Sequence, residues 1–137
     1  MIMAIDYATS MGVAWTIDGK SIYVSSIVGS HYQHLAFLKI IIGRKKATVL
    51  IEQLNFFRNA KTVRSLLMKG GYVIYSITKT PEFVSAPASR KFLGCKNKKQ
   101  VFDKFSDIVQ NTDESDAIAL LLYKLNKQRE EVSIERR

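Results

Sequence analysis

The stretch that decides the fold is Ile5-Asp6-Tyr7-Ala8-Thr9-Ser10-Met11-Gly12-Val13-Ala14-Trp15, which follows the apolar residues Met1-Ile2-Met3-Ala4. It places one acidic residue, Asp6, inside an otherwise apolar strand. A carboxylate in such a strand costs free energy unless a partner compensates its charge, and hard cations prefer carboxylate oxygen. Asp6 is therefore a candidate metal ligand, although an aspartate in a turn or a cap would have the same sequence signature.

The residues that follow predict an antiparallel meander of three strands. Residues 12–17 form its second strand and residues 21–28 its third. The Asp18-Gly19 pair between them is one of the strongest short hairpin signals. Residues 32–42 are densely apolar, which favours a buried helix after the meander. The chain therefore opens as three strands with one carboxylate on the first.

A strand, a helix and a second strand are predicted next. Residues 47–52 are apolar and partly β-branched, and they end in an acid. Residues 60–69 have a helical pattern, Gly70-Gly71 would end that helix, and residues 72–77 are rich in tyrosine, valine and isoleucine. A β-α-β unit of this length implies parallel pairing of its two strands.

An alanine- and leucine-rich helix is predicted after Asn111. Asn111 and Glu114 have the spacing of a capping box, a reciprocal pair of hydrogen bonds at the start of a helix. Asp113 and Asp116 lie three residues apart, so they share one face at the positive end of this helix. Residues 129–137 are expected to form a charged C-terminal tail that frays, which leaves residues 1–128 as one domain.

The composition is that of a folded domain. With 137 residues, 47% of them hydrophobic, the chain can build a core. No run approaches 18 apolar residues, so no membrane partner is expected, and the N-terminus lacks the basic region of a signal peptide. The single cysteine, Cys95, excludes an internal disulfide and fits a reducing compartment. His31 and His34 have no further Cys or His ligands to accompany them, so surface or capping roles are expected for both.

Positive charge is concentrated in the middle of the chain. The net charge is +9, yet residues 39–104 alone carry 15 lysines or arginines against three acids. The segments on either side of this region are slightly negative. A basic region of this kind favours a nucleic-acid partner over a merely soluble basic surface.

Four carboxylates stand out together, and they are Asp6, Glu52, Asp113 and Asp116. Each has an ordinary explanation on its own, such as capping a helix or complementing its dipole. Acids from separate elements converge in a basic chain only where cations hold them together. Two divalent ions about 4 Å apart, bridged by such acids, make the usual site for phosphodiester cleavage. The four are therefore the candidate metal-binding and catalytic residues.

The order of these motifs resembles the RuvC family of Holliday-junction resolvases, within the ribonuclease H-like fold. The resemblance runs from about residue 3 to residue 125 and rests on Ile51-Glu52-Gln53 and on Asp113-Glu114-Ser115-Asp116-Ala117-Ile118-Ala119. It implies an α/β fold with a mixed central sheet, in which the antiparallel meander is joined by parallel strands and flanked by helices.

The resemblance also implies an activity. The family predicts a homodimeric, metal-dependent endodeoxyribonuclease of DNA recombination and repair, which resolves four-way junctions and leaves 5′-phosphate and 3′-hydroxyl ends. It places two Mg²⁺ ions, with Mn²⁺ able to substitute, on the four carboxylates. A base-stacking aromatic falls on Phe56 or Phe57, beside Arg58. The basic residues that would hold DNA are Arg90, Lys91, Lys98 and Lys99. The expected location is the cytoplasm, for a bacterial or phage-encoded protein, or an organellar matrix.

Two features depart from the family pattern. The usual Asp-Pro-Gly turn is Asp6-Tyr7-Ala8 here, and the segment between Asp6 and Glu52 is shorter than in the bacterial enzymes. The shortening fits a compact phage-like or organelle-like variant and leaves the dimer contacts open. Two alternatives remain. One is another ribonuclease H-like nuclease, acting on RNA–DNA hybrid or related to YqgF, and the other is a non-catalytic DNA-binding module.

Overall fold

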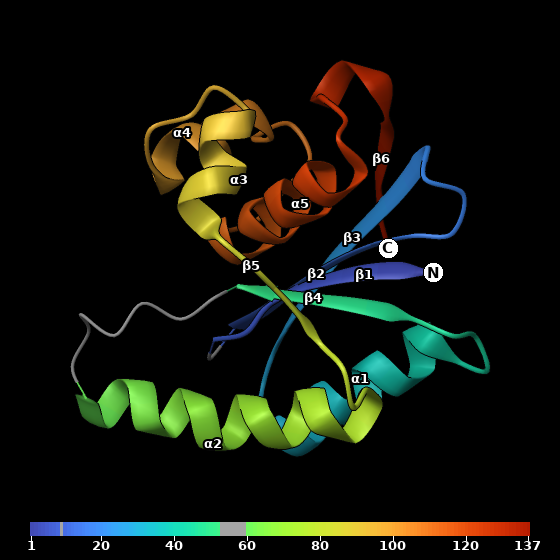
Figure 1. Ribbon diagram of the computed structural model, residues 1–137, viewed down its shortest axis with the longest axis vertical. Coiled ribbons are helices and arrows are strands. Elements are labelled where there is room, and N and C mark those ends of the chain that lie inside the picture. Colours follow the sequence, from blue (N-terminus) through green and yellow to red (C-terminus); the bar gives the residue numbers. More distant parts are fainter. Residues whose placement is uncertain (9, 53–59) are drawn as a thin grey trace.

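The computed structural model describes residues 1–8, 10–52 and 60–137, and residues 60–67 are described by their backbone alone. Within these residues the centre is one mixed sheet in the order β5-β4-β1-β2-β3-β6 (Figure 1). Its strands are β1 (Ile2–Asp6), β2 (Ser10–Thr16), β3 (Ser21–Val28), β4 (Thr48–Glu52), β5 (Glu82–Val84) and β6 (Ser133–Arg136). The pairs β1–β2 and β2–β3 are antiparallel, whereas β1–β4, β4–β5 and β3–β6 are parallel.

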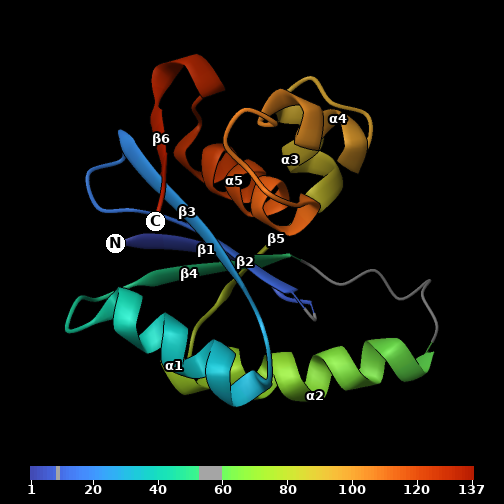
Figure 2. The ribbon, with the colours of Figure 1, turned by 180° about the vertical axis from the view of Figure 1, so that it is seen from behind.

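Helices cover both faces of this sheet, as the two opposite views show (Figures 1 and 2). One face carries α1 (His31–Ile42) and α2 (Ala60–Ile77), which pack against each other. The other face carries α3 (Ala86–Phe92), α4 (Lys98–Lys104) and α5 (Thr112–Leu125), and the short 3₁₀ helix η1 (Arg129–Glu131) leads into β6. The predicted α/β architecture, a three-stranded meander joined by parallel strands and flanked by helices, is therefore confirmed.

Each face of the sheet has its own hydrophobic core, because successive residues of a strand point to opposite faces. Met3 and Val13 point toward α1 and α2, where they pack in one core with Val73. Ala4 points the other way and packs in the second core, which is built around α5. Residues 114–122 of α5 are all buried, so this helix is the centre of its layer. The position of α5 on the sheet therefore decides where its N-terminal acids lie.

The hairpin predicted at Asp18-Gly19 joins β2 to β3. Asp18 Oδ1 accepts hydrogen bonds of 2.8 Å from the backbone N–H groups of both Lys20 and Ser21. Gly19 has φ +76°, a left-handed conformation that a glycine adopts without strain. The turn chemistry thus sets the register of the meander.

The strand predicted at residues 72–77 is wrong, because α2 continues through Gly70 and Gly71 to Ile77. Val73 and Ile74 are buried while Tyr72 and Tyr75 are exposed, which is the pattern of an amphipathic helix. The parallel β-α-β unit itself exists, but its second strand is β5. Gly70 has a packing role, since a Cβ there would lie 3.0 Å from the ring of Tyr7.

The expectation that the C-terminal tail frays is also wrong. Residues 133–136 form β6, which pairs in parallel with β3 at the edge of the sheet. The backbone N–H groups of Ser133 and Arg137 extend this pairing, with hydrogen bonds to Lys20 and Val24 of 2.9 and 3.0 Å. The sheet therefore gains a strand that carries Arg136 toward α5.

His34 is a buried residue rather than the surface or capping histidine that was expected. Its side chain is 2% exposed, and Nδ1 lies 3.1 Å from the hydroxyl of Tyr7. Ser30 is the residue that caps α1, in a reciprocal pair of hydrogen bonds with Gln33. Over the residues that the structure describes, no helix has the length and apolar character needed to cross a bilayer.

Candidate active site

The candidate site is built on one row of paired residues that runs across four neighbouring strands of the sheet. Asp6 of β1 pairs with Gly12 of β2, and Gly12 pairs with Ser26 of β3. On the other side, Ile5 pairs with Ile51, which places Glu52 beside Asp6 at the ends of two parallel strands. Directly paired residues share a face, so Asp6, Gly12, Ser26 and Glu52 all point toward the α5 layer. We call these four residues the cross-strand row.

The N-terminus of α5 lies directly on this row. A Cβ added to Gly12 would lie 2.3 Å from both the carbonyl carbon and the oxygen of Asp113, so only glycine leaves room for this approach. Asn111 caps the helix, because its side-chain oxygen accepts from the backbone N–H of Glu114 at 2.9 Å. Asp113 is thereby held over the sheet beside Asp6, and Asp116 follows one turn later.

The predicted carboxylates act on one another electrostatically. Burial raises the pKa of Asp6 well above its ordinary value, and the charges of Asp116, Glu52 and Asp113 raise it further. Burial also raises the pKa of Asp116, against the opposing effect of Lys98 and Arg90. The strands β1 and β4 and the helix α5 thus bring all four predicted acids close enough for the charges of the other three to act on Asp6. These charges make ionisation of Asp6 unfavourable until a cation compensates them.

The buried oxygen atoms fit a divalent cation. The Oδ2 atoms of Asp6 and Asp116 are buried without a hydrogen-bond partner, which is costly for a carboxylate. Within the described part of the chain, no three Asp, Glu, His or Cys side chains are close enough together to hold one ion as they stand. The carboxylate oxygens are the ligands that Mg²⁺ prefers, so the donor set suits this ion once the side chains draw together around it.

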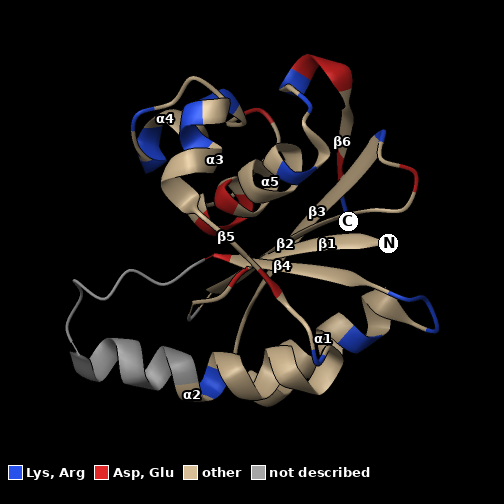
Figure 3. Cartoon of the chain, in the orientation of Figure 1, with Lys and Arg blue, Asp and Glu red and all other residues tan. Residues whose placement is uncertain are grey.

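Basic side chains border the carboxylates on α3 and α4, where Figure 3 shows lysine and arginine gathered. Lys98 Nζ lies 3.4 Å from Asp116 Oδ2, an ion pair longer than a charge-assisted hydrogen bond. Arg90 acts on Asp116 through its charge. Lys91 and Lys99 are exposed on the same two helices. Of the predicted DNA-binding cations on α3 and α4, Lys98 and Arg90 therefore act on Asp116 directly, and the other two are exposed on the same helices.

The remaining predicted DNA-binding residues, Phe56, Phe57 and Arg58, lie outside the described residues. Their segment connects the end of β4, where Glu52 stands, to the start of α2. The stacking role of the phenylalanines stays a prediction from the sequence.

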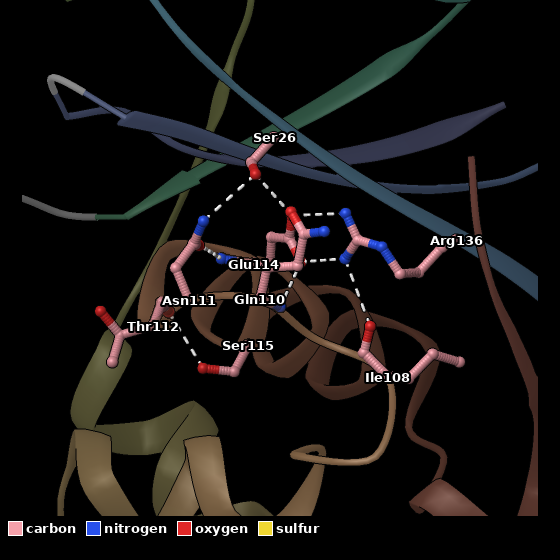
Figure 4. A network of polar contacts seen from close by, with 8 residues as sticks. All are labelled: Ser26, Ile108, Gln110, Asn111, Thr112, Glu114, Ser115 and Arg136. Atoms are coloured by element: carbon pink, nitrogen blue, oxygen red, sulfur yellow. Dashed lines mark hydrogen bonds and ion pairs between the residues drawn. The ribbon is translucent and has the colours of Figure 1, made fainter.

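Sequence reasoning missed a network of polar contacts behind the acids (Figure 4). The side chain of Glu114 is fully buried and accepts hydrogen bonds from the hydroxyl of Ser26, the backbone N–H of Gln110 and the guanidinium of Arg136. Burial opposes the ionisation of Glu114, but these donors outweigh burial and lower its pKa. The capping box predicted here is half correct, because the Glu114 carboxylate bonds to Gln110 rather than to Asn111.

The sequence matches no protein-family model and no curated protein, whereas solved structures share its fold. Thermus thermophilus RuvC in complex with a Holliday junction substrate superposes with a TM-score of 0.67 at 12% identity, covering 90% of this chain and 92% of that one. Another Thermus thermophilus RuvC structure gives 0.61 at 15% identity, covering 92% and 96%. The chain therefore has a RuvC-like fold, as its motifs predicted.

Proposed function

We propose that this protein is a metal-dependent endodeoxyribonuclease that cuts four-way DNA junctions. The observation that carries the proposal is the convergence of four carboxylates, from β1, β4 and α5, beside the basic helices α3 and α4. The fold is similar to that of RuvC nucleases, and one of the similar structures is described as a complex with a Holliday junction substrate. Fold and site chemistry point to the same reaction class, phosphodiester hydrolysis.

The residues that would hold two Mg²⁺ ions, or Mn²⁺ in their place, are Asp6, Glu52, Asp113 and Asp116. The chemistry that such ions supply when bound is activation of a water molecule and stabilisation of the departing 3′ oxygen. The buried Oδ2 of Asp6, which has no hydrogen-bond partner, and that of Asp116, which has only the long ion pair with Lys98, support this assignment. The cleavage would leave a 5′-phosphate and a 3′-hydroxyl.

The cations beside the acids have a separate role. Lys98 lies at the start of α4 with 40% of its side chain exposed, so it is open to a phosphate while remaining close to Asp116. Arg90 is partly buried and acts on the same acid. Both cations would stabilise the negative charge that builds on the phosphoryl oxygens during cleavage. Lys91 and Lys99, which are more exposed, would bind the flanking backbone of the DNA.

To prefer junctions, the protein must recognise a structural feature that a four-way junction has and duplex DNA lacks. Phe56 and Phe57 follow the strand that carries Glu52 and are accompanied by Arg58. An aromatic side chain can stack on an unpaired base, a contact worth about 1–3 kcal/mol per base. The centre of a junction offers such bases at modest cost, whereas duplex must first be unpaired. We therefore assign junction selectivity to this segment.

Two symmetric cuts call for two sites related by a two-fold axis, so we propose a homodimer. The outer surface of α1 and α2 supports this proposal, because it exposes large apolar side chains that no described element covers. These are Tyr32, Ile40, Met68, Tyr72 and Tyr75, with exposed fractions of 47% to 80%. This surface lies on the side of the sheet opposite α3, α4 and α5 (Figure 1). A second copy that docks there would leave both basic surfaces free for DNA.

The test is a comparison of substrates. Purified protein is incubated with Mg²⁺ and a synthetic four-way junction, the matching duplex, or an RNA–DNA hybrid, and the ends are mapped. We expect paired, symmetric cuts in the junction and little cleavage of the others. Equal cleavage of duplex and junction would replace the proposal with a less selective nuclease, and preference for the hybrid would indicate a ribonuclease H activity. Tight junction binding without cleavage under any divalent ion would indicate a binding module.

A further inference from the structure

The strongest feature outside the proposed chemistry is an ion pair between the fully buried Glu114 of α5 and the partly exposed Arg136 of the C-terminal strand. The guanidinium of Arg136, in β6, contacts both carboxylate oxygens of Glu114, the second through Nη2 at 3.1 Å. Arg136 Nη1 also donates to the backbone carbonyl of Ile108 at 3.2 Å. Glu114 has no exposed surface, and Ser26 of β3 donates to it from the other side (Figure 4).

This ion pair holds the turn of α5 that carries the candidate ligands. Glu114 stands directly after Asp113 and two residues before Asp116, so its backbone cannot move without theirs. Ser26 belongs to the cross-strand row, next to Gly12 and one further strand from Asp6. Asn111, the capping residue, also donates to Ser26, at 3.1 Å. The network therefore ties the start of α5 to the same row of the sheet that presents Asp6.

We infer that Arg136 and Glu114 are positioning residues, which set the distance between the acids of α5 and Asp6 and thereby the affinity of the site for divalent ions. Neither side chain is proposed to touch metal or DNA. The inference rests on the proposed function, because it takes the four carboxylates to be metal ligands. Removing a residue that orients a metal ligand without binding the metal itself typically lowers metal affinity about 10- to 100-fold.

The pair differs from an ordinary surface ion pair in two respects. The Glu114 carboxylate is fully enclosed, so loss of Arg136 leaves a buried charge without its partner. The carboxylate would then turn toward other donors or draw in water, and either change would displace the first turn of α5. Arg136 comes from the edge of the sheet, with β3 and β2 between its strand and β1. An effect of Arg136 on metal binding would therefore be transmitted through Glu114.

The experiment measures Mn²⁺ binding by isothermal titration calorimetry, without DNA, in wild type and in Arg136→Met. The matched control is Arg137→Met, which removes the same charge from the neighbouring residue. Arg137 is exposed and lies over the ring of Tyr23, 4.4 Å from its centroid, with no contact to Glu114. We expect Mn²⁺ affinity to fall about 10-fold or more in Arg136→Met and to stay within about twofold of wild type in Arg137→Met.

A double variant shows whether the effect is transmitted through Glu114. In Glu114→Gln no buried charge is left to compensate, so adding Arg136→Met should weaken Mn²⁺ binding by much less than it does in wild type. Ser26→Ala, which removes one donor from the same carboxylate, provides a milder variant if Arg136→Met does not fold. Its Mn²⁺ affinity should also fall.

The outcomes separate the inference from the proposed function. Wild-type Mn²⁺ affinity in a folded Arg136→Met protein, or in Ser26→Ala where that variant has to be used, would overturn the positioning role and leave the nuclease proposal intact. A wild-type protein that binds no Mn²⁺ would overturn both. Equal losses in Arg136→Met and Arg137→Met would show a general effect of charge and would also overturn the positioning role.

Discussion

Replacing Gly12 by alanine should move the acids of α5 away from Asp6. The added Cβ would lie 2.3 Å from the backbone of Asp113 and 2.7 Å from the nitrogen of Glu114. Backbone atoms cannot rotate out of the way as a flexible side chain can, so α5 must shift by about 1 Å to restore ordinary contact. Overpacking of this kind costs about 1–3 kcal/mol of unfolding free energy, and a displacement of about 1 Å at a catalytic site can cost about 100-fold in rate.

The assay combines urea unfolding, followed by circular dichroism, with junction cleavage in Mg²⁺. The control is Gly71→Ala, because Gly71 lies in α2 and, among the described residues and apart from the neighbouring backbone of its own helix, no atom lies within 4 Å of its added Cβ. This control should gain up to about 1 kcal/mol in stability and cleave at the wild-type rate. A Gly12→Ala protein with the wild-type unfolding midpoint and the wild-type cleavage rate would refute the argument that α5 touches the sheet at Gly12.

Three further predictions follow from the site and the surface. The first concerns Asp6, whose pKa is raised in the folded state above its value in the unfolded chain. Because the folded state binds this proton more tightly, the unfolding free energy measured without divalent ions should fall as pH rises from about 4 through the raised pKa. Asp6→Asn should flatten this decline in urea titrations, and an unchanged slope would contradict the burial argument. Tyr72→Glu should shift sedimentation from dimer to monomer, whereas a dimer that survives would place the contact elsewhere. Phe56→Ala or Phe57→Ala should slow junction cleavage more than it weakens binding, and wild-type cleavage in both folded variants would remove the stacking role.

Much of the fold could be predicted because local patterns decide it. The alternation of residues and the Asp18-Gly19 turn define the meander, and the Asn111 cap marks the start of α5. The sequence predicted a strand at residues 72–77 because tyrosine, valine and isoleucine favour strands. In the structure these residues continue α2, and the burial of Val73 and Ile74 beside the exposed Tyr72 and Tyr75 is that of an amphipathic helix. The tail was misassigned because its charges suggest a solvated segment, whereas Ile134 and Arg136 bury their side chains in part against the second core and α5.

Some features of the candidate site could likewise be predicted from the sequence, and others depend on contacts between distant elements. The sequence predicted that Asp6 and Glu52 converge as metal ligands, because each follows an apolar strand, but the parallel pairing of β1 with β4 that brings them together is a finding of the structure. The need for Gly12 could not be predicted, since it depends on how closely α5 approaches the sheet. The contact between Glu114 and Arg136 joins helix α5 to strand β6 across 22 residues of sequence, and no local sequence pattern encodes a contact of that separation.

The measurement that tests the central claim most directly compares charge-removing variants of the four acids with a matched acid elsewhere. Asp6→Asn, Glu52→Gln, Asp113→Asn and Asp116→Asn are assayed for junction binding and for cleavage in Mg²⁺, beside Asp103→Asn on the exposed side of α4. We predict that the four variants bind the junction and fail to cut it, while Asp103→Asn cuts at the wild-type rate. Wild-type cleavage by any one of the four would contradict the assignment of that residue, and wild-type cleavage by all four would contradict the account of the site.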